Sequence, residues 1–456
     1  MYVKQIYTKC LSQASYYIES GGEAVVIDPL RDVNEYIKIA DHASVKIKYV
    51  IETHFHADFV SGHLTLAKLT GAKIIYGPNA DPKFDAIIAT DNQVFKFGKV
   101  TLTTIHTPGH TLESTSFLLK DKNGKEHSIF TGDTLFLGDV GIPDVAQRYK
   151  GLSKEDLAGI LFDSINKRIK PLPNDILVYP AHGAGSACGK KMMKQTIDNL
   201  GNQKEVNYSL NNSCNKNEFV KLLTDNLPEP PSYFPYNVKL NQEGYDDLSE
   251  ILKRSNNPFS VEDFEKKMNL NGVKILDVRS HYDFCLGHIP NSIFIGIDGG
   301  FAPWVGAIFS DVNQPILLVA DESRVEEIIT RLSRIGFDNV LGYLEGGFKS
   351  WQQKNNYNKV NSIDSNQFYS KKFENSKILD VRNSSELESI GKVSGAKNIS
   401  LQNLLSQIDD LEVNSEYLVF CAGGYRSVIA ASILQANSFK YVYNILGGFN
   451  SIKGHL

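Results

Sequence analysis

The sequence predicts an α/β protein of three domains. Its 456 residues are enough for about three domains of roughly 150 residues each. Apolar, strand-like runs alternate with helical stretches through the first half of the chain, which is typical of α/β layers. The second half contains one segment twice, with about 100 residues in each copy. These observations predict one larger domain followed by a duplicated smaller one.

The first domain is predicted to cover residues 1–226. Strands are indicated by the runs EAVVIDP, IKYVIETH, AKIIYG, KVTLTTIH, STSFLL, HSIFTGD and DILVYPAH, and helices by the stretches at 33–40 and 62–69. The passage LPEPPSYFPYN at 227–237 is rich in proline, which neither a helix interior nor a central strand accepts. We therefore predict a linker over residues 227–245.

The duplicated segment forms two further domains, predicted at residues 246–358 and 362–456. KILDVRSHYDF (274–284) in the first copy matches KILDVRNSSEL (377–387) in the second, and YLEGGFKSW matches NILGGFNSI. Strands and helices alternate in each copy, which predicts a parallel sheet with helices on both faces. Two copies are a duplication rather than a solenoid.

Composition excludes several classes of protein. The 48 basic and 52 acidic residues give a net charge of -4, which favours neither nucleic acid nor a membrane surface as a partner. No stretch approaches the ~20 apolar residues of a membrane span. The five cysteines form no CxxC pair, so free thiols are expected rather than a disulfide scaffold or a zinc ribbon. A cytoplasmic protein is the prediction.

Metal chemistry is expected in the first domain, because eight of the eleven histidines lie between residues 42 and 182. Six side chains of types that ligate metals stand where strand-like runs end: His54, His56, Asp58, His110, Asp133 and His182. The ends of neighbouring strands meet at one edge of a layered sheet. We therefore expect these side chains to converge on a metal site.

These motifs resemble the metallo-β-lactamase superfamily, whose HxHxDH signature is followed by a histidine, an aspartate and a last histidine. The resemblance covers roughly residues 1–225 and implies an αββα sandwich. Here HFHADF places Phe59 where the signature has a histidine for a second metal, which counts against a full dinuclear zinc site. LSQASY, ETHFHADFVSG, TPGHTLES and YPAHGAGS are similar to the persulfide dioxygenase branch. That branch implies one iron(II) per chain, held by His54, His110 and Asp133.

A face of two histidines and one carboxylate suits the implied chemistry. It leaves three positions of an iron(II) ion open, so that a thiolate sulfur and O2 can bind side by side, whereas zinc has no redox chemistry. His56, Asp58 and His182 would then orient the ligands or hold water, as remnants of a second site. The family usually has arginine where this chain has Ile142, which implies a different substrate preference.

A second reactive site is predicted at Cys421, in VFCAGGYRS near the end of the chain. A strand, a short glycine-rich loop and a helix follow one another there, so the loop amides can form an anion nest at the helix N-terminus. Such a nest stabilises a thiolate or persulfide anion, and Arg426 adds a fixed positive charge. The loop residues expected to bind substrate are Gly423, Gly424, Tyr425 and Ser427.

Residues 362–456 are similar to the rhodanese sulfurtransferases, through DVR upstream of this loop and LGGF downstream. The short loop favours transfer of sulfane sulfur over phosphatase chemistry. Counting back from the shared GGF places Ala320 opposite Cys421, so the first copy resembles a rhodanese that cannot carry sulfur. A scaffold or interface role is expected for it, and Cys285 within it is expected to be a core residue.

Cys188 follows His182 closely in YPAHGAGSACGKK, which would place it near the rim of the metal cleft. The two lysines after it could activate its thiol, so that it accepts sulfur. An ordinary loop cysteine fits equally well. Cys10 and Cys214 have no motif around them and are expected to be structural.

The order of the three domains resembles bacterial fusions of a persulfide dioxygenase with a sulfurtransferase. This implies that O2 oxidises low-molecular-weight persulfides to sulfite, and that Cys421 passes sulfane sulfur to sulfite to give thiosulfate, for sulfide detoxification. A homo-oligomer is also expected. Two other functions stay open: a dinuclear zinc thioester hydrolase of the glyoxalase II type fused to a rhodanese, and a non-catalytic persulfide carrier or sensor.

Overall fold

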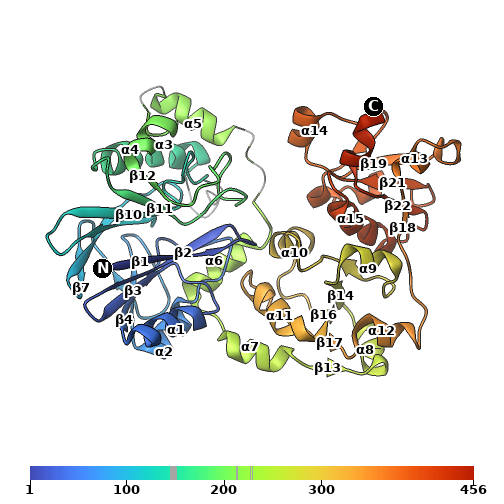
Figure 1. The fold of residues 1–456 in the computed structure, drawn as a ribbon, viewed down its shortest axis with the longest axis horizontal. Coiled ribbons are helices and arrows are strands. Elements are labelled where there is room, and N and C mark those ends of the chain that lie inside the picture. The colour runs from blue at the N-terminus through green and yellow to red at the C-terminus, as the bar shows by residue number, and fades with distance from the viewer. Residues whose placement is uncertain (144–150, 212–213, 226, 228–229, 456) are drawn as a thin grey trace. The chain divides into compact units, whose positions relative to one another are not determined.

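The computed structural model describes residues 1–143, 151–211, 214–225, 227 and 230–455. Within these residues the strands form two sheets of six and two sheets of five. The chain divides into two compact units, one made of residues 1–248 with 333–336 and the other of 249–332 with 337–456. Figure 1 shows the course of the chain, with the first unit mostly in blue to green and the second in yellow to red.

The first unit is a sandwich of two sheets, with strand orders β1-β2-β3-β4-β5-β6 and β12-β11-β10-β9-β8-β7. Side chains of both inner faces, such as Tyr16, Phe117 and Phe130, pack together as one core. The strands are β1 (Tyr2–Thr8), β2 (Gln13–Ser20), β3 (Glu23–Ile27), β4 (Lys46–Ile51), β5 (Lys73–Tyr76), β6 (Ile87–Ile88), β7 (Val94–Phe97), β8 (Val100–His106), β9 (Thr115–Lys120), β10 (Glu126–Gly132), β11 (Leu177–Pro180) and β12 (Asp198–Asn199).

Helices cover the outer face of each sheet, which confirms the predicted αββα sandwich. Tyr36 and Leu66 pack from α1 and α2 onto the first sheet, and Leu161 and Phe219 pack from α3 and α5 onto the second. Burying such apolar stripes stabilises the layers by about 25 cal/mol for each Å² of apolar surface. The helices are α1 (Asn34–Ala43), α2 (His63–Thr70), α3 (Lys154–Ser164), the π-helical turn η2 (Ile165–Ile169), α4 (Leu200–Val206) and α5 (Lys216–Thr224).

Parallel pairing brings together the carboxyl ends of the strands that precede the predicted ligands. β3 pairs with β4, and β10 with β11, in parallel. The loop after β4 is tied to the second sheet, because the amide of Thr115 donates to the carbonyl of Thr53. The amide of Ala181, after β11, donates to the carbonyl of Gly132 at the end of β10. These bonds hold the segments after β4, β10 and β11 at one edge of the sandwich.

The segment predicted as a linker contains a helix, α6 (Phe234–Glu243). Pro235 stands in its first turn, where no intrahelical N–H bond is lost. The expectation that proline excludes a helix here was therefore wrong for the second half of the segment, and α6 lies in the first unit. The predicted end of the first domain at residue 226, and residues 228–229 of the linker, lie outside the described residues.

The second unit contains two parallel sheets with the same topology, β13-β17-β16-β14-β15 and β18-β22-β21-β19-β20. The prediction of two α/β domains with parallel sheets is confirmed. The register matches as well, because Val319 pairs with Asp277 in one sheet and Phe420 with Asp380 in the other. The residues that follow, Ala320 and Cys421, therefore stand at equivalent positions.

The strands of this unit are short and alternate with helices. The first copy contains β13 (Pro258–Phe259), α8 (Val261–Met268), β14 (Lys274–Asp277), α9 (His281–Leu286), β15 (Ile293–Phe294), α10 (Phe301–Ile308), β16 (Ile316–Val319), α11 (Val325–Ser333), β17 (Val340–Leu344) and α12 (Gly347–Gln352), and α7 (Leu248–Ser255) precedes it. The second contains β18 (Asn361–Ile363), α13 (Ser365–Phe368), β19 (Lys377–Asp380), α14 (Ser384–Ile390), β20 (Lys397–Asn398), β21 (Tyr417–Phe420), α15 (Tyr425–Ala436), β22 (Val442–Ile445) and α16 (Phe449–Ile452).

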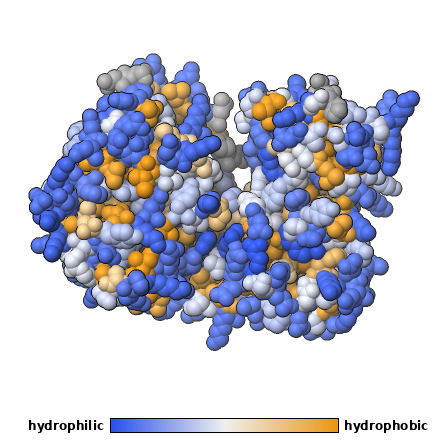
Figure 2. Space-filling view, in the orientation of Figure 1, coloured by the Kyte–Doolittle hydropathy of each residue, from blue (hydrophilic) through white to orange (hydrophobic). Residues whose placement is uncertain are grey.

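One face of the molecule is mainly polar. On the face shown in Figure 2 hydrophilic residues predominate and apolar ones are scattered. Buried apolar side chains instead form separate cores in the sandwich and in each smaller domain. Across the described part of the chain, no helix is both long enough and apolar enough to cross a membrane.

Candidate functional site

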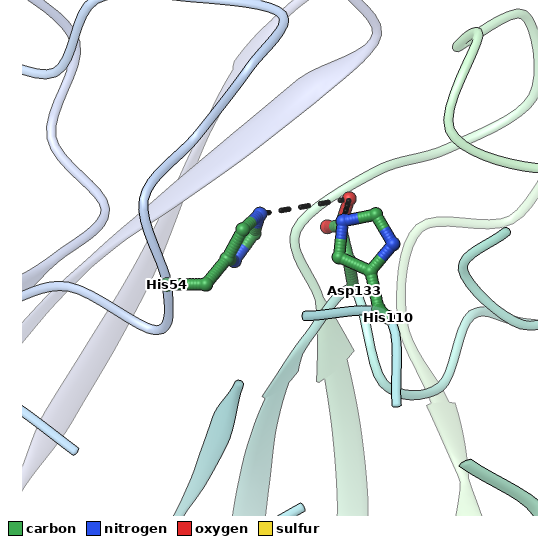
Figure 3. Close-up of side chains that lie close together, drawn as sticks. All are labelled: His54, His110 and Asp133. Carbon is green, nitrogen blue, oxygen red and sulfur yellow. Dashed lines mark ion pairs between the residues drawn. The ribbon is translucent and has the colours of Figure 1, made fainter. Parts of the chain in front are cut away.

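Three of the predicted metal ligands come together in the first unit (Figure 3). His54 lies in the loop after β4, His110 between β8 and β9, and Asp133 directly after β10. Each offers one ligand atom, and these atoms all lie within 4.8 Å of one another. Oδ2 of Asp133 is 4.0 Å from Nε2 of His54 and 3.5 Å from Nε2 of His110. All three side chains are buried, so the group lies within the protein rather than on its surface.

Hydrogen bonds fix which nitrogen of each histidine faces the group. Nδ1 of His110 is 2.7 Å from the carbonyl oxygen of Ile142, which can only accept, so this Nδ1 carries the proton. The hydroxyl of Thr53 donates to Asp28 over 2.9 Å and therefore accepts from Nδ1 of His54 at 3.0 Å. Nε2 is left without a proton in both rings, which is the form that binds a metal ion.

Asp28 supports the loop that carries His54. It follows β3 with a φ of 49°, in the left-handed region where residues other than glycine are strained. Its two carboxylate oxygens accept from the amide and the hydroxyl of Thr53. Asp28 was not among the predicted site residues. The one sequence signal for it is its place at the end of a strand-like run, which it shares with Asp133.

The donor set fits a cation. Burial raises the pKa of Asp133 to about 7; His182 opposes this shift and Asp58 adds to it. The carboxylate oxygens of Asp133 have no hydrogen bond of good geometry among the described residues, and the thiol of Cys188 lies close enough to lower the pKa in part. A buried carboxylate without such partners is costly unless a proton or a cation neutralises it. Two histidine nitrogens and one carboxylate are ligands that both iron(II) and zinc accept.

His56 points away from this group, in spite of its place in the signature. Its Nε2 lies 3.1 Å from Oδ1 of Asp28 and 3.5 Å from Oε2 of Glu52. Burial opposes the charged form of His56, but Asp28 and then Glu52 outweigh burial and raise the pKa of the ring to about 9. The ring of Phe59 lies against it, with centroids 4.3 Å apart. His56 therefore belongs to a separate buried cluster with the two carboxylates.

Asp58, His182 and Cys188 form a second group beside the first. Their ligand atoms lie within 4.8 Å of one another, and Nε2 of His182 is 3.5 Å from both Asp58 and Asp133. Cys188 is only 3% exposed and does not lie at the rim where the sequence placed it. Its carbonyl accepts from the amide of Ile142, and this bond draws its loop inward. The thiol is thus brought next to the predicted ligands.

Ile142 serves the site through its backbone. Its side chain packs in the apolar core of the second sheet and is 2% exposed, while its carbonyl holds His110. Gly141 before it has no room for a side chain, since an added Cβ would lie 2.1 Å from the carbonyl oxygen of Asp133. Residues 141–142 therefore support two ligands, and no cationic side chain is present at position 142 to meet an anionic substrate.

Asn241 of helix α6 makes a contact with the metal-binding loop that the sequence did not predict. Its side-chain amide donates to the carbonyls of His56 and Phe59, each at 2.8 Å. Its side-chain oxygen accepts from the amide of Ser61 at 2.9 Å. Asn241 is fully buried and satisfies three backbone groups of one loop. We call these three bonds the Asn241 clasp; no motif signals it, because it joins segments about 180 residues apart.

Tyr233, at the start of α6, also lies near the second group. It is buried, and burial, with added repulsion from Asp58 and Cys188, raises its pKa well above the usual value. A neutral phenol therefore faces these two groups. The segment that contains it was predicted as a linker, so sequence reasoning missed this residue too.

The predicted nucleophile Cys421 lies in the loop between β21 and α15. The amide of Gly424 donates to Sγ of Cys421 at 3.1 Å, and the hydroxyl of Ser427 lies 3.6 Å from the same sulfur. Gly424 has a φ of 102°, which glycine adopts without strain. The buried sulfur thus meets a backbone N–H, as an anion-binding loop requires.

Asn444 orients Ser427, and no sequence pattern indicated this. Oγ of Ser427 makes its shortest contact with Oδ1 of Asn444, at 2.7 Å. A carbonyl oxygen only accepts, so the hydroxyl donates to Asn444 and turns its lone pairs to other neighbours. Asn444 pairs with Val419 in its sheet as Tyr343 pairs with Leu318 in the other copy. The copy without the cysteine therefore has tyrosine at the position of Asn444.

Arg426 is paired within its own domain. Its guanidinium donates to both oxygens of Glu386, at 2.6 and 2.7 Å. These bonds raise the pKa of Arg426, burial opposes the shift, and Cys421 adds to it. The guanidinium is therefore within electrostatic reach of Cys421, but it shares its charge with Glu386.

The other predicted substrate-binding residues divide into two kinds. Gly423 faces open space, because an added Cβ would meet no atom within 4 Å. Tyr425 leaves the loop, and its hydroxyl donates to the carbonyl of Gly296 in the preceding copy at 3.0 Å. The structure therefore brings Gly423, Gly424 and Ser427 to Cys421, but not the ring of Tyr425.

The equivalent loop of the first copy has two exposed carboxylates, those of Asp321 and Glu322. Glu322 accepts from the amide of Gly346 at 2.5 Å, and Asp321 accepts from the amide of Ser323 at 3.0 Å. A cavity of about 720 Å³, lined in part by Ala320, remains beside these groups. Cys285, expected in the core, is half-buried, and burial raises its pKa to about 11.

Each half of the chain is similar to a known family. Residues 8–182 match the metallo-beta-lactamase superfamily, and residues 260–354 and 365–455 match the rhodanese-like domain.

The human protein persulfide dioxygenase ETHE1, mitochondrial, is 32% identical over 212 residues, which are 46% of this chain and 74% of that protein. The cytoplasmic hydroxyacylglutathione hydrolase of Arabidopsis thaliana is 29% identical over 185 residues, 40% of this chain and 67% of that protein. The crystal structure of a metallo-beta-lactamase from Staphylococcus aureus subsp. aureus COL is 34% identical, covers 75% of this chain and 98% of its own, and has a TM-score of 0.66.

Proposed function

The chain belongs to the metallo-β-lactamase superfamily, with an N-terminal domain homologous to ETHE1-type persulfide dioxygenases and rhodanese-like domains after it, and from this we propose that it is a persulfide dioxygenase joined to a sulfurtransferase. Its substrates are a low-molecular-weight persulfide and O2 at the first site, and sulfite at the second. The group of His54, His110 and Asp133 carries the proposal. It brings together two histidine Nε2 atoms and one carboxylate, and Phe59 cannot ligate a second metal.

We propose that this group holds one iron(II) ion per chain. Iron(II) supplies the redox chemistry between O2 and sulfane sulfur, which zinc cannot supply. Three protein ligands leave room for substrates on the metal. The protein's part is to hold Nδ1 of each histidine through Ile142 and Thr53, so that Nε2 is the atom that faces the metal. It also keeps the site buried, so that bulk water is excluded.

The proposed oxidation balances with one water molecule: RSSH, O2 and H2O give RSH, SO3²⁻ and two protons. The outer sulfur of the persulfide loses four electrons and O2 gains them. The S–S bond breaks, and the carrier leaves as a thiol. Asp58 and His182 lie 3.5 Å apart and next to Asp133, so they are placed to take up the released protons.

Cys188 is proposed as a thiol that exchanges sulfane sulfur with the substrate. Its sulfur would form a new S–S bond with the outer sulfur of RSSH, and RSH would leave with one proton. The support is its burial and its place in one group with Asp58 and His182. Cys188→Ser should then lower the rate of persulfide exchange while the metal content stays the same.

At the second site we propose that Cys421 carries sulfane sulfur as a persulfide and passes it to sulfite. The S–S bond of the Cys421 persulfide breaks, an S–S bond forms in thiosulfate, and the proton stays with the Cys421 thiol. The amide of Gly424 lies at the leaving sulfur, where it stabilises the negative charge. Gly423 leaves access to the loop.

A zinc thioester hydrolase is the second candidate function. Hydroxyacylglutathione hydrolases are among the relatives, at 29% identity in fission yeast and in Arabidopsis thaliana, and Asp58 and His182 still lie beside Asp133. Phe59 and the turn of His56 toward Asp28 count against it. This alternative predicts two zinc ions per chain, hydrolysis of S-lactoylglutathione and no oxygen uptake.

The deciding experiment is metal analysis of anaerobically purified protein, together with oxygen consumption after addition of glutathione persulfide. About one iron per chain with oxygen uptake and sulfite or thiosulfate as product is the expected result. Two zinc ions with thioester hydrolysis and no uptake would overturn the proposal. In Cys421→Ser, oxygen uptake should continue while sulfite accumulates in place of thiosulfate, and an unchanged product would contradict the division of labour.

We further propose that the protein works in the cytoplasm, in sulfide detoxification. All five cysteines are free thiols, and thiols persist in a reducing compartment. Cell fractionation would check the first part. Loss of sulfide tolerance on deletion of the gene, restored by wild type but not by Cys421→Ser, would support the second.

A further inference from the structure

The domain that lacks the reactive cysteine contacts the loop that contains it. Tyr425 belongs to the loop CAGGYR, but its half-buried side chain packs against the preceding copy. Its hydroxyl donates to the carbonyl of Gly296 at 3.0 Å. Its ring lies edge-on to Phe294, with centroids 5.8 Å apart. Burial also raises the pKa of this phenol, so a neutral ring fills the contact.

Gly299 makes room for the ring. An added Cβ at this position would lie 2.3 Å from Cζ and 2.5 Å from the hydroxyl oxygen of Tyr425. The backbone of Gly299 is outside the left-handed region, so glycine is needed here for space and not for conformation. We call Phe294, Gly296 and Gly299 the tyrosine cradle.

A second bond ties the same helix to the cradle. The amide of Phe294 donates to Oγ of Ser432 at 3.0 Å, and both residues are buried. Phe294 lies in β15, the edge strand of its sheet, where an amide has no neighbouring strand on one side. Ser432 follows Tyr425 by about two helical turns. Helix α15 is therefore held at two points along its length.

The position of Tyr425 is linked to the sulfur through one residue. Gly424, directly before it, donates its amide to Cys421 with a φ of 102°. Arg426, directly after it, is held by Glu386 of its own domain. The loop is therefore fixed from two sides, by the tyrosine cradle of one domain and by a carboxylate of the other.

We propose that the tyrosine cradle sets the conformation of the Cys421 loop, so that reactivity at Cys421 depends on a domain that has no nucleophile. The inference rests on the proposed role of Cys421 as a sulfur carrier. Tyr425 acts here as a positioning residue, because it touches neither the sulfur nor the substrate. The cysteine-free copy thereby gains a function in the chemistry of its neighbour.

Gly299→Ala in the full-length chain tests this, with Gly300→Ala as the matched control. At Gly300 an added Cβ meets only the ring of Trp304, at 3.3 and 3.4 Å. Two rates are measured: alkylation of Cys421 by iodoacetamide against pH, followed on its own peptide by mass spectrometry, and sulfur transfer from thiosulfate to cyanide. Gly299→Ala should slow both about tenfold, as expected for the loss of a bond to a charged group. It should also move the midpoint of the alkylation profile to higher pH, while Gly300→Ala stays within about twofold.

Tyr425→Ala completes a double-mutant cycle. Without the ring of Tyr425, a methyl group added at position 299 no longer clashes with it. Gly299→Ala should therefore cause no further loss of either rate in the Tyr425→Ala background. Additive losses would overturn the proposal, as would an unchanged alkylation profile in Gly299→Ala. If that variant does not fold, Tyr425→Phe removes only the bond to Gly296 and should slow alkylation about threefold.

Thermal unfolding and oxygen uptake serve as controls, since neither measures the loop directly. A wild-type chain that transfers no sulfur, yet whose Cys421 alkylation follows the cradle variants, would refute the proposed function and leave the cradle supported. The two ideas can therefore fail separately.

Discussion

The two rhodanese-like domains share one sheet topology and differ in the loop after β16 and β21. In the last domain the amide of Gly424 meets the sulfur of Cys421. In the middle domain Asp321 accepts from the amide of Ser323, Glu322 accepts from Gly346 after β17, and alanine stands in place of the cysteine. The scaffold is kept while the loop has two negative charges, which disfavour an anion there. Chemistry in this fold therefore depends on a few loop residues, not on the sheet.

Both copies contain the motif DVR, and its arginine makes the same two contacts in each copy. This supports the interpretation. Arg279 donates to Asp277 and lies over the ring of Phe348 at 4.3 Å. Arg382 does the same with Asp380 and with Phe449, at 3.9 Å. A motif that marks the family by sequence thus maintains the fold, and it persists where the nucleophile is missing.

The largest effect is expected at the cysteine itself. Cys421→Ala should reduce sulfur transfer from thiosulfate to cyanide by roughly a thousandfold or more, as loss of a nucleophile does. Ala320→Cys should not create activity in the middle domain, because the adjacent carboxylates of Asp321 and Glu322 disfavour a thiolate. Sulfur transfer by the double variant Ala320→Cys/Cys421→Ala would contradict this, because it would show that the middle domain lacks only the cysteine.

The buried arginines should differ in their effect on stability. Arg382 is fully buried and its partner Asp380 is 1% exposed, whereas the side chain of Arg279 is 16% exposed. Arg382→Ala leaves an unpaired buried carboxylate and should cost about 3–5 kcal/mol. Arg279→Ala should cost less, because loss of the partly exposed Arg279 opens a path for water to the buried carboxylate of Asp277. Urea unfolding would measure both, with Lys440→Ala at an exposed position as the control; equal costs would contradict the argument.

A smaller effect is expected from the hydroxyl beside the sulfur. Ser427→Ala should change the rate of Cys421 alkylation by less than about twofold, because the hydroxyl donates its proton to Asn444 and not to the sulfur. Asn444→Ala should speed alkylation about threefold, since the released hydroxyl can then donate to the thiolate. Ser451→Ala removes a serine that bonds only to main-chain carbonyls and should change the rate little. A clearly slower rate in Ser427→Ala would show that the hydroxyl donates to the sulfur.

The smallest effect is expected from pH. Hydrogen bonds from Arg426 lower the pKa of Glu386 below its ordinary 4.5, and burial opposes the shift. The pair thus stabilises the domain fully above about pH 4.5, and this contribution is lost as pH falls through the lowered folded-state value. The melting temperature of the wild type should therefore fall more steeply between about pH 5 and pH 3 than that of Glu386→Gln. If the melting temperatures of both proteins fell equally with pH, the Arg426–Glu386 pair would not contribute to the pH dependence of stability.

Residues at strand ends could be predicted from the sequence. His54, His110 and Asp133 each follow an apolar run, and parallel strands bring such ends together. The repeat likewise placed Ala320 opposite Cys421, and the sheet register agrees. In both cases the information is local, because it depends on the pattern within one segment.

Side-chain directions and distant contacts could not be predicted in this way. His56 stands two residues from His54, yet Asp28 and Glu52 turn it away, and no spacing links these carboxylates to the motif. Tyr425 lies inside a recognisable loop but packs against another domain. Such outcomes are decided by which segments meet in three dimensions, and one sequence does not show that.

The Asn241 clasp has a consequence for how such chains are assembled in evolution. Helix α6 is joined to the metal-binding loop by three bonds, and the residues after it are joined too: Tyr245 accepts from the amide of Leu64, and Asp247 from Thr65. A gene segment that ended near residue 226 would carry the metal ligands without the clasp, and would expose three backbone groups of their loop. Recombination that keeps these bonds must therefore break the chain after Asp247, so the connector is inherited with the domain it follows.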